Sequence, residues 1–449
     1  MRGGKPEPKL STSPYKYKEN HISNESKGWL NALQSTERQQ KVSFSSYFSN
    51  DIRSNKSICT LLPLIPESIN SHAVVAHCMK QVSVITEKAN PGQRPIITAD
   101  QPVYALCKQV QMIDLKFKRF FCKMGDLHTE MAFLSCIGDW LEGSGWTEIY
   151  DKSGISSKGR VENFLKGSKV KRTRYAHHVT LKVLVDFTVE AFNSSSCNDF
   201  EKWKEMRKKE SSTAFYWFTT MEMIIVLSMF VRSIINCNFE LYMHSLRAML
   251  PWFFALDHTH YSRWLTVYVN DLEDLQEDSH LLMEFISGKF AVNKTGKSFS
   301  SMGEDQAHEQ HNKIIKENGG GIGIFTNPKA ILEWSLTSSF ISDMLLEKNE
   351  DDSSLHHENN DRYETTYRND CDSLYKSWKS FGNPFNDISP LVHMTSRIIL
   401  SDDSERSVRK AHEIGLRQYE DFNEKRSSLY DTIKKNKLPL FRQKNLHAS

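Results

Sequence analysis

The stretch PIITADQPVYALCKQVQM (residues 95–112) begins with a compact β-branched run that ends at Asp100. A helical pattern follows, and Pro102 suits its start because proline fits the first turn of a helix. KRFFCKMGD (118–126) repeats this order, because an apolar run ends in Asp126 and the helical pattern LHTEMAFLSCIGDWLEGSGW (127–146) follows. Two strands joined by a helix of this length predict a parallel βαβ unit.

Helical patterns fill most of the chain outside this unit. Residues 72–89 precede it with apolar positions at helical spacing, and helices are the only elements expected from Tyr175 to about Phe290. The pattern of residues 304–318 predicts a helix, and the three glycines that follow it would end the helix. The fold class is therefore α/β, mainly helical.

The organisation of the chain follows from these patterns and from shifts in composition. We expect a disordered N-terminal tail (1–28), the N-terminal part of an α/β core (29–150), a basic loop with a large all-α insertion (151–295), a late helix that completes the core (296–345), an acidic linker (346–372) and a helical C-terminal region (373–449).

Bulk properties favour an intracellular protein, nuclear or cytoplasmic. The eight cysteines of the 449 residues form no C-x-x-C pair, which indicates reduced thiols, and the N-terminus has no apolar stretch like that of a signal peptide. Residues 214–231 are long and apolar enough to raise the question of a membrane span, but Glu222 lies at their middle. We therefore expect a buried core helix and no membrane partner.

Three carboxylates are candidates for chemistry. Asp100 and Asp126 each end a strand, so in a parallel sheet both would lie at the carboxyl edge, where α/β proteins hold ligands. Glu309 shares one face of its predicted helix with Asp305, His308 and Asn312. Clustered carboxylates suit Mg²⁺ or Mn²⁺. Two such ions could activate a water molecule that attacks a phosphodiester bond. In the alternative interpretation Asp100 and Asp126 cap the helices that follow them, and the polar face around Glu309 meets solvent.

A basic run is the candidate for nucleic-acid binding. Lys152 to Arg174 holds eight Lys and Arg residues against one acid, Glu162, although the net charge of the whole chain is only +3. Such a run is either a solvated loop or a patch that contacts backbone phosphates. The histidine pairs 177–178 and 258–260 have no acid or cysteine partners at metal spacing, so we interpret them as structural or surface residues.

Five blocks together resemble a known family: ITADQPVYALCKQVQ, MGDLHTEMAFLSCIGDWLEGSGW, PWFFALDHTHYSRW, FAVNKTGKSFSSMGEDQAHEQHN and FGNPFNDISP. They are similar to the family of the domain of unknown function 6589, found in transposon-like reading frames, over roughly residues 28–441. That family looks related to cut-and-paste transposases with an RNase H-like core. The resemblance implies a partial RNase H-like core here.

The resemblance also implies roles for single residues. Asp100 would be the second acid of a metal-binding triad and Glu309 the third, both binding Mg²⁺ or Mn²⁺, with Asp126 as an extra catalytic candidate. The residues expected to contact DNA come instead from the basic run, and they are Lys169, Lys171, Arg172 and Arg174. No strand upstream of Asp100 carries a first acid, so a transposase-derived protein that binds DNA without cutting it is the leading hypothesis, and an active one would be a Mg²⁺- or Mn²⁺-dependent transposase or nuclease. The rival hypothesis is a non-catalytic helical scaffold or interaction protein.

Overall fold

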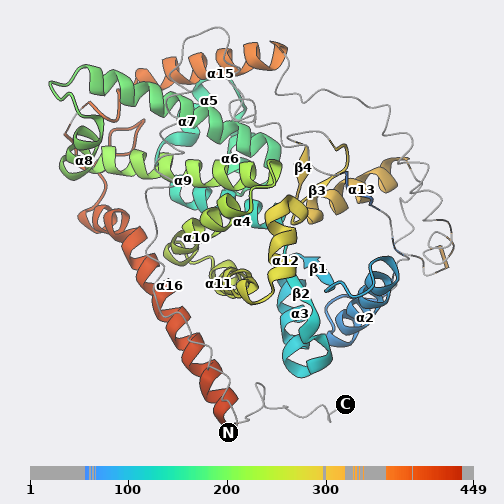
Figure 1. Cartoon of the computed structure of the whole chain (residues 1–449). Helices are drawn as coiled ribbons and strands as arrows, with labels where there is room; N and C mark the ends of the chain where they lie inside the picture. The colour runs from blue at the N-terminus through green and yellow to red at the C-terminus, as the bar shows by residue number, and fades with distance from the viewer. Residues whose placement is uncertain are drawn as a thin grey trace.

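Helices dominate the computed structural model, as the sequence predicts (Figure 1). The structure describes residues 56–59, 62, 65, 67–296, 300–318, 361–386 and 388–436, together with positions 327, 329, 330, 333 and 337. The predicted tail (1–28) and residues 346–360 of the predicted linker lie outside these residues. The elements of the first half are α2 (His72–Ala89), β1 (Ile96–Ala99), α3 (Gln101–Ile113), the 3-10 turn η1 (Leu115–Arg119), β2 (Phe121–Met124), α4 (Asp126–Leu141), α5 (Trp146–Lys152), α6 (Lys158–Leu165), α7 (Val170–Asn193), α8 (Phe200–Glu210) and α9 (Ser212–Ile235).

The second half continues with short helices and a second small sheet. Its elements are α10 (Phe239–Ala255), α11 (Thr259–Glu273), the 3-10 turn η2 (Asp274–Glu277), α12 (Ser279–Glu284), the π turn η3 (Phe285–Lys289), β3 (Val292–Asn293), β4 (Ser301–Met302), α13 (Glu304–Asn318), α15 (Asp361–Lys379) and α16 (Asp402–Asn436).

An α/β corner is built by β1, β2 and the helices beside them. The two strands pair in parallel, with Ile96 opposite Phe121 and Ala99 opposite Met124, and α3 connects them. The predicted βαβ unit is therefore confirmed. In Figure 1 the corner lies at the lower right, where α2 and α3 run beside the strands. Within the described ranges this sheet has two strands, and β3 and β4 form a separate antiparallel pair.

The helical body surrounds α9. By length and composition alone this helix could cross a membrane, yet 83% of its most apolar window is buried inside the protein. It packs against α4, α7, α8, α10 and α16, as the core helix of a soluble protein does. Glu222, the acid at its middle, accepts hydrogen bonds from Lys204 and Lys208 of α8 at 3.1 and 3.2 Å.

Side-chain caps begin several helices of this body. Asp199 accepts a hydrogen bond from the backbone N–H of Lys202 at the start of α8, and Asn238 accepts one from Leu241 at the start of α10. Such caps satisfy N–H groups that have no partner inside the helix. They explain why the helices start where short polar residues interrupt the apolar pattern.

The C-terminal helices lie against this body. In α15 the buried side chains Tyr367, Cys371, Leu374 and Trp378 repeat at helical spacing, and the helix packs against α7 and α5. Residues 361–372, which the sequence placed in an acidic linker, thus form the first part of α15. Their charges misled the prediction, because the helix is amphipathic, with Tyr367 and Cys371 buried while Arg368 and Asp372 are exposed.

Candidate functional site

Asp100 lies where the sequence places it, at the carboxyl edge of the parallel sheet. It directly follows β1, and its Oδ1 accepts a hydrogen bond of 3.3 Å from the backbone N–H of Val103. It is the N-cap of α3, as the capping interpretation predicts. One of its oxygens is therefore committed to the helix start.

Asp126 does not cap its helix. The N-cap of α4 is Gly125, and the Asp126 carboxylate turns inward, where Oδ2 accepts a hydrogen bond of 2.6 Å from Lys123 and Oδ1 one of 2.7 Å from the Tyr242 hydroxyl. Lys123, whose side chain is 0% exposed, also donates to Glu304 at the start of α13. The capping interpretation of Asp126 is wrong, because Lys123 in the preceding strand is a buried cation that needs a carboxylate.

The charges of this buried network shift one another's pKa values. Burial raises the pKa of Asp126, although Lys123 opposes this. Burial also raises the pKa of Glu304, to about 7, against the same lysine. For Lys123 burial alone would lower the pKa, but Asp126 and Glu304 raise it overall. The lysine therefore stays charged and holds β2, α4 and α13 together.

Asp305 is the residue that caps α4. Its oxygens accept hydrogen bonds from the backbone N–H groups of Leu127 and His128 at 3.0 and 3.1 Å, and its Oδ2 lies 3.0 Å from His128 Nδ1. Gly125 permits this approach, because a Cβ there would lie 2.4 Å from Asp305 Oδ2. Burial would raise the pKa of Asp305, but these hydrogen bonds lower it overall.

His128 feels the charges of two of the three predicted acids. Its hydrogen bond to Asp305 raises its pKa, and the charges of Asp100 and Glu309 raise it further. Glu309 itself is exposed on α13. The charges of Asp100 and Glu309 thus both raise the pKa of one side chain although 209 positions separate them, whereas Asp126 belongs to the buried network of Lys123 and Glu304.

The arrangement does not fit the Mg²⁺ or Mn²⁺ site implied by the resemblance. Asp100 is engaged at a helix start, and Asp126 binds a lysine and a tyrosine. Among the described residues no group of three or more His, Cys, Asp and Glu side chains could hold a metal ion. Lys123 occupies the position at which a cation would neutralise Asp126 and Glu304.

Of the four basic residues predicted to contact DNA, three are free to do so. Lys169, Lys171 and Arg172 are exposed around the start of α7. Arg174 instead donates from Nε and Nη2 to both carboxylate oxygens of Glu130 on α4, each at 2.7 Å. This bidentate pair ties α7 to α4, so Arg174 acts in the fold.

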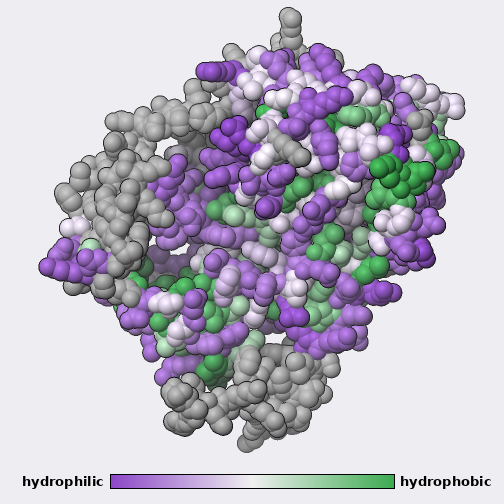
Figure 2. Space-filling view, turned by 180° about the vertical axis from the view of Figure 1, so that it is seen from behind, coloured by the Kyte–Doolittle hydropathy of each residue, from purple (hydrophilic) through white to green (hydrophobic). Residues whose placement is uncertain are grey.

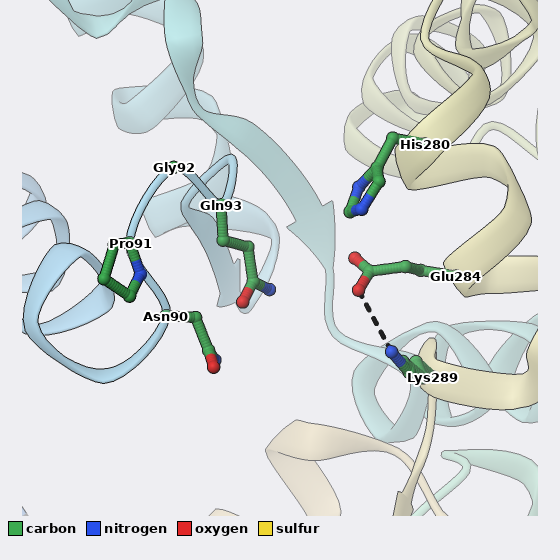
Figure 3. Close-up of a pocket in the computed structure, with 7 residues that line it drawn as sticks. All are labelled: Asn90, Pro91, Gly92, Gln93, His280, Glu284 and Lys289. Atoms are coloured by element: carbon green, nitrogen blue, oxygen red, sulfur yellow. Dashed lines mark hydrogen bonds and ion pairs between the residues drawn. The ribbon is translucent and has the colours of Figure 1, made fainter.

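A hollow of about 450 Å³ lies elsewhere, between the turn that follows α2 and helix α12 (Figure 3). Gln93 and, one turn apart on α12, His280 and Glu284 point into it, and Glu284 pairs with Lys289 at 3.1 Å. None of the predicted site residues lines it. It is a polar surface hollow and adds nothing to the site around His128.

The family model "Domain of unknown function (DUF8702)" matches residues 42–199 and 192–448. The chain belongs to the DUF8702 family. No curated protein and no solved structure matches it. The resemblance to the family of domain 6589, and with it the relation to cut-and-paste transposases, is therefore wrong. The roles that it gave to Asp100, Asp126 and Glu309 have no support from the DUF8702 match.

His128 and Lys123 were not predicted as members of this region. A lysine inside the apolar run FFCKM was the available signal for Lys123, because a cation in a buried strand requires a carboxylate partner. His128 carried no such signal, since its role depends on Asp305, which lies 177 positions further along the chain.

Proposed function

We propose that the protein binds the phosphate backbone of nucleic acid at the turn between α6 and α7. This basic turn comprises residues 166–172 and presents four exposed cationic side chains: Lys166, Lys169, Lys171 and Arg172. The observation that carries the proposal is that three of these cations surround the N-terminus of one long helix, α7, which has no side-chain cap.

The electrostatics of the helix start favour an anionic ligand. A helix N-terminus carries a partial positive charge and is stabilised by acidic residues, each by roughly 0.3–1 kcal/mol. The first turn of α7 has no acid, and Lys169, Lys171 and Arg172 add positive charge there. Extra positive charge at a helix start is unfavourable, and a phosphate group would compensate both the helix dipole and the cations.

The basic turn is held firmly against α4. Gly167 has a φ of +63°, and a Cβ there would lie 2.5 Å from the carbonyl oxygen of Met131. Arg174 and Glu130 fix the next turn of α7 on the same helix. A rigid basic corner loses little conformational entropy when it binds, which favours it over a mobile basic tail.

The proposal is tested with the Lys169→Ala/Lys171→Ala/Arg172→Ala protein and a short DNA duplex. Binding measured by fluorescence anisotropy over a range of salt concentrations should weaken equally for duplexes of unrelated sequence. The slope of log affinity against log salt should fall by about one for each phosphate contact removed, and thus by about three. Arg174 stays unchanged in this variant because its loss would disturb the fold.

A matched control removes the same charge elsewhere. The Lys80→Ala/Lys209→Ala/Lys376→Ala protein loses three exposed lysines from α2, α8 and α15. It should keep most of the affinity of the parent and its salt slope. Equal losses in both variants would mean that only overall charge matters, and a parent that does not bind DNA would overturn the proposal.

An interaction protein is the second candidate, and one observation favours it. Ile388, Ile398 and Ile399 in the segment between α15 and α16 are each about two-thirds exposed. Hydrophobic patches also interrupt the mostly hydrophilic surface of the face shown in Figure 2. Exposed apolar side chains of this kind suit protein contacts. If the parent protein does not bind DNA at low salt, this second function is favoured.

For the α/β corner we keep a partial RNase H-like core as a proposal about the fold alone. Its support is the parallel β1–β2 pair and the return of α13 to the carboxyl edge of that pair. Strand cleavage is not part of the proposed function, because Asp126 is buried against Lys123.

A further inference from the structure

β1 is the more exposed strand of the parallel pair in the α/β corner. All of its residues are half-buried, whereas all residues of β2 are buried. Helices α2 and α13 also pack against β1, but β2 is the one strand that pairs with it among the described residues. One edge of β1 therefore lies on β2 and the other faces away from the sheet.

The hydrogen bonds to β2 show which backbone groups of β1 are used. The carbonyl oxygens of Pro95 and Ala99 accept hydrogen bonds from the β2 side of the pair, at 2.9 and 2.7 Å. Because the backbone groups of consecutive strand residues point to alternate sides, the N–H and C=O groups of Ile96 and Thr98 point away from β2. We call these groups the outer edge of β1.

The outer edge is open for pairing. No hydrogen bond to these groups of Ile96 or Thr98 is formed by the part of the chain that the structure describes. Proteins blunt an unpaired edge with proline or with charged side chains, and the sequence of β1, IITA, contains neither. An extended segment can add to such an edge as a new strand through main-chain hydrogen bonds.

Acidic side chains lie at the carboxyl end of this edge. Asp100 directly follows β1. The N–H of Gly125 donates to the carbonyl oxygen of Ala99, and a Cβ on Gly125 would lie 2.4 Å from Asp305 Oδ2, so α13 begins beside the end of β1. Glu309 is exposed one helical turn after Asp305. Within the described residues neither Asp100 nor Glu309 forms an ion pair, so the two carboxylates are available to a cation.

We propose that the outer edge of β1 binds an extended basic segment of a partner protein as a third strand. Main-chain pairing with Ile96 and Thr98 holds the segment in place. A Lys or Arg side chain of the segment pairs with Asp100 or Glu309, and this negative charge selects a basic segment over an acidic one. The site lies on the α/β corner and does not depend on nucleic-acid binding at the basic turn of α7.

The test measures the fluorescence anisotropy of a labelled short peptide of alternating lysine and valine mixed with the full chain. The same peptide with glutamate in place of lysine should bind about tenfold more weakly, because Asp100 and Glu309 repel it. Methylation of every backbone nitrogen keeps the charge of the lysine peptide but removes its N–H donors, so it should abolish binding. Methylation of alternate nitrogens should be tolerated, since one edge of the peptide can still pair.

Two protein variants test the two parts of the site. Thr98→Pro removes an N–H group that faces outward, so it should lose peptide binding without breaking a bond to β2, whereas Thr98→Val should bind like the parent. Asp100→Asn/Glu309→Gln removes both charges, and the asparagine can still cap α3. This variant should bind the lysine peptide about fivefold more weakly at low salt, and high salt should reduce the difference.

Matched controls remove charge elsewhere. The Glu205→Gln/Glu413→Gln protein loses two exposed acids from α8 and α16 and should bind the lysine peptide like the parent. The Lys169→Ala/Lys171→Ala/Arg172→Ala protein should also bind it like the parent, which separates this site from the basic turn.

Several outcomes would overturn the proposal. If the fully methylated peptide still binds, charge alone holds it and no strand is added. If the parent binds neither peptide, another part of this chain or a second copy covers the edge. Equal affinity of Asp100→Asn/Glu309→Gln and the parent would remove the reason for a basic partner. Circular dichroism shows whether Thr98→Pro folds, and if it does not, the methylated peptides alone decide whether a strand is added.

Discussion

His177 lies fully buried in α7, with its ring stacked on Trp146 at a centroid distance of 5.6 Å. Neither ring nitrogen has a hydrogen-bond partner within the described part of the chain. Burial lowers its pKa to about 3, from 6.5 in an unfolded chain. The histidine is therefore structural, as the sequence suggested, and it is neutral in the folded protein.

The depressed pKa of His177 makes stability depend on pH in a defined direction. The unfolded chain takes up a proton on this histidine below pH 6.5, while the folded chain does so only near pH 3, so stability is lost as the pH falls between these values. At pH 5 the loss is about 2 kcal/mol. His177→Phe should remove this part of the pH dependence and, by removing two unpaired polar atoms, stabilise the protein at pH 7 by about 1 kcal/mol.

Urea unfolding at pH 7 and at pH 5 measures both effects. The exposed His308 provides the control, since His308→Gln should leave the difference between the two pH values as in the parent. His178, whose pKa burial also lowers to about 3 together with Arg174 and His177, is present in all three proteins. If His177→Phe and the parent lose equal stability at pH 5, the buried neutral histidine is not the cause.

At the candidate site, the sequence predicted positions better than roles. Asp100 directly follows β1 and Glu309 lies in α13, as expected, because strand ends and helices follow from local patterns. Asp126 was given the wrong partner, since its role depends on Tyr242, which lies 116 positions away, as well as on Lys123. Capping was assigned to Asp126 although Asp305 performs it, because a cap from a distant helix leaves no local pattern.

At the scale of elements, close helix contacts depend on glycine. Gly138 lies inside α4 where α6 crosses it, and a Cβ at this position would lie 1.7 Å from the carbonyl oxygen of Leu165. Gly138→Ala must therefore push the two helices apart and should destabilise the protein by about 2–3 kcal/mol. The loss is measured as a shift in the urea midpoint.

Gly159 in α6 is the matched control for that substitution. A Cβ there would meet nothing within 4 Å, and its φ is not in the left-handed region. Gly159→Ala should stabilise the protein by about 0.5 kcal/mol, because alanine loses less conformational freedom in a helix. Equal and small effects in the two variants would show that α4 and α6 have room to separate.

Elements with strong periodicity were predicted well, and those defined by charge were not. The strands around 96–99 and 121–124 and the helix 304–318 match the sequence expectation because apolar runs and a glycine stop define them locally. Residues 361–372 were assigned to a linker because the stretch from 350 to 372 contains eight acids and only a few apolar residues. Packing of these apolar residues on α7 makes it a helix.

At the scale of the whole molecule, the buried apolar residues form one continuous cluster. It extends from Val75 in α2 to Met394 beyond α15 and includes the strands of the α/β corner and the helices of the body. Trp378 of α15 shows the connection, because its ring lies 4.7 Å from that of Trp217 in α9 and 6.1 Å from that of Phe187 in α7. The regions into which we divided the chain from its sequence are therefore expected to unfold together.

Trp378→Ala tests this cooperativity from the C-terminal side. Loss of a fully buried tryptophan should cost about 3–5 kcal/mol. Since the core is continuous, urea should unfold the variant in one transition, at the same midpoint by circular dichroism and by tryptophan fluorescence. Hydrogen exchange should show α4, α9 and α15 losing protection by the same amount, whereas the exposed substitution Lys376→Ala on the same helix should leave it unchanged. Two separate transitions, or loss of protection confined to α15, would contradict a single cooperative core, because α15 would then unfold as a unit that the α/β corner does not need.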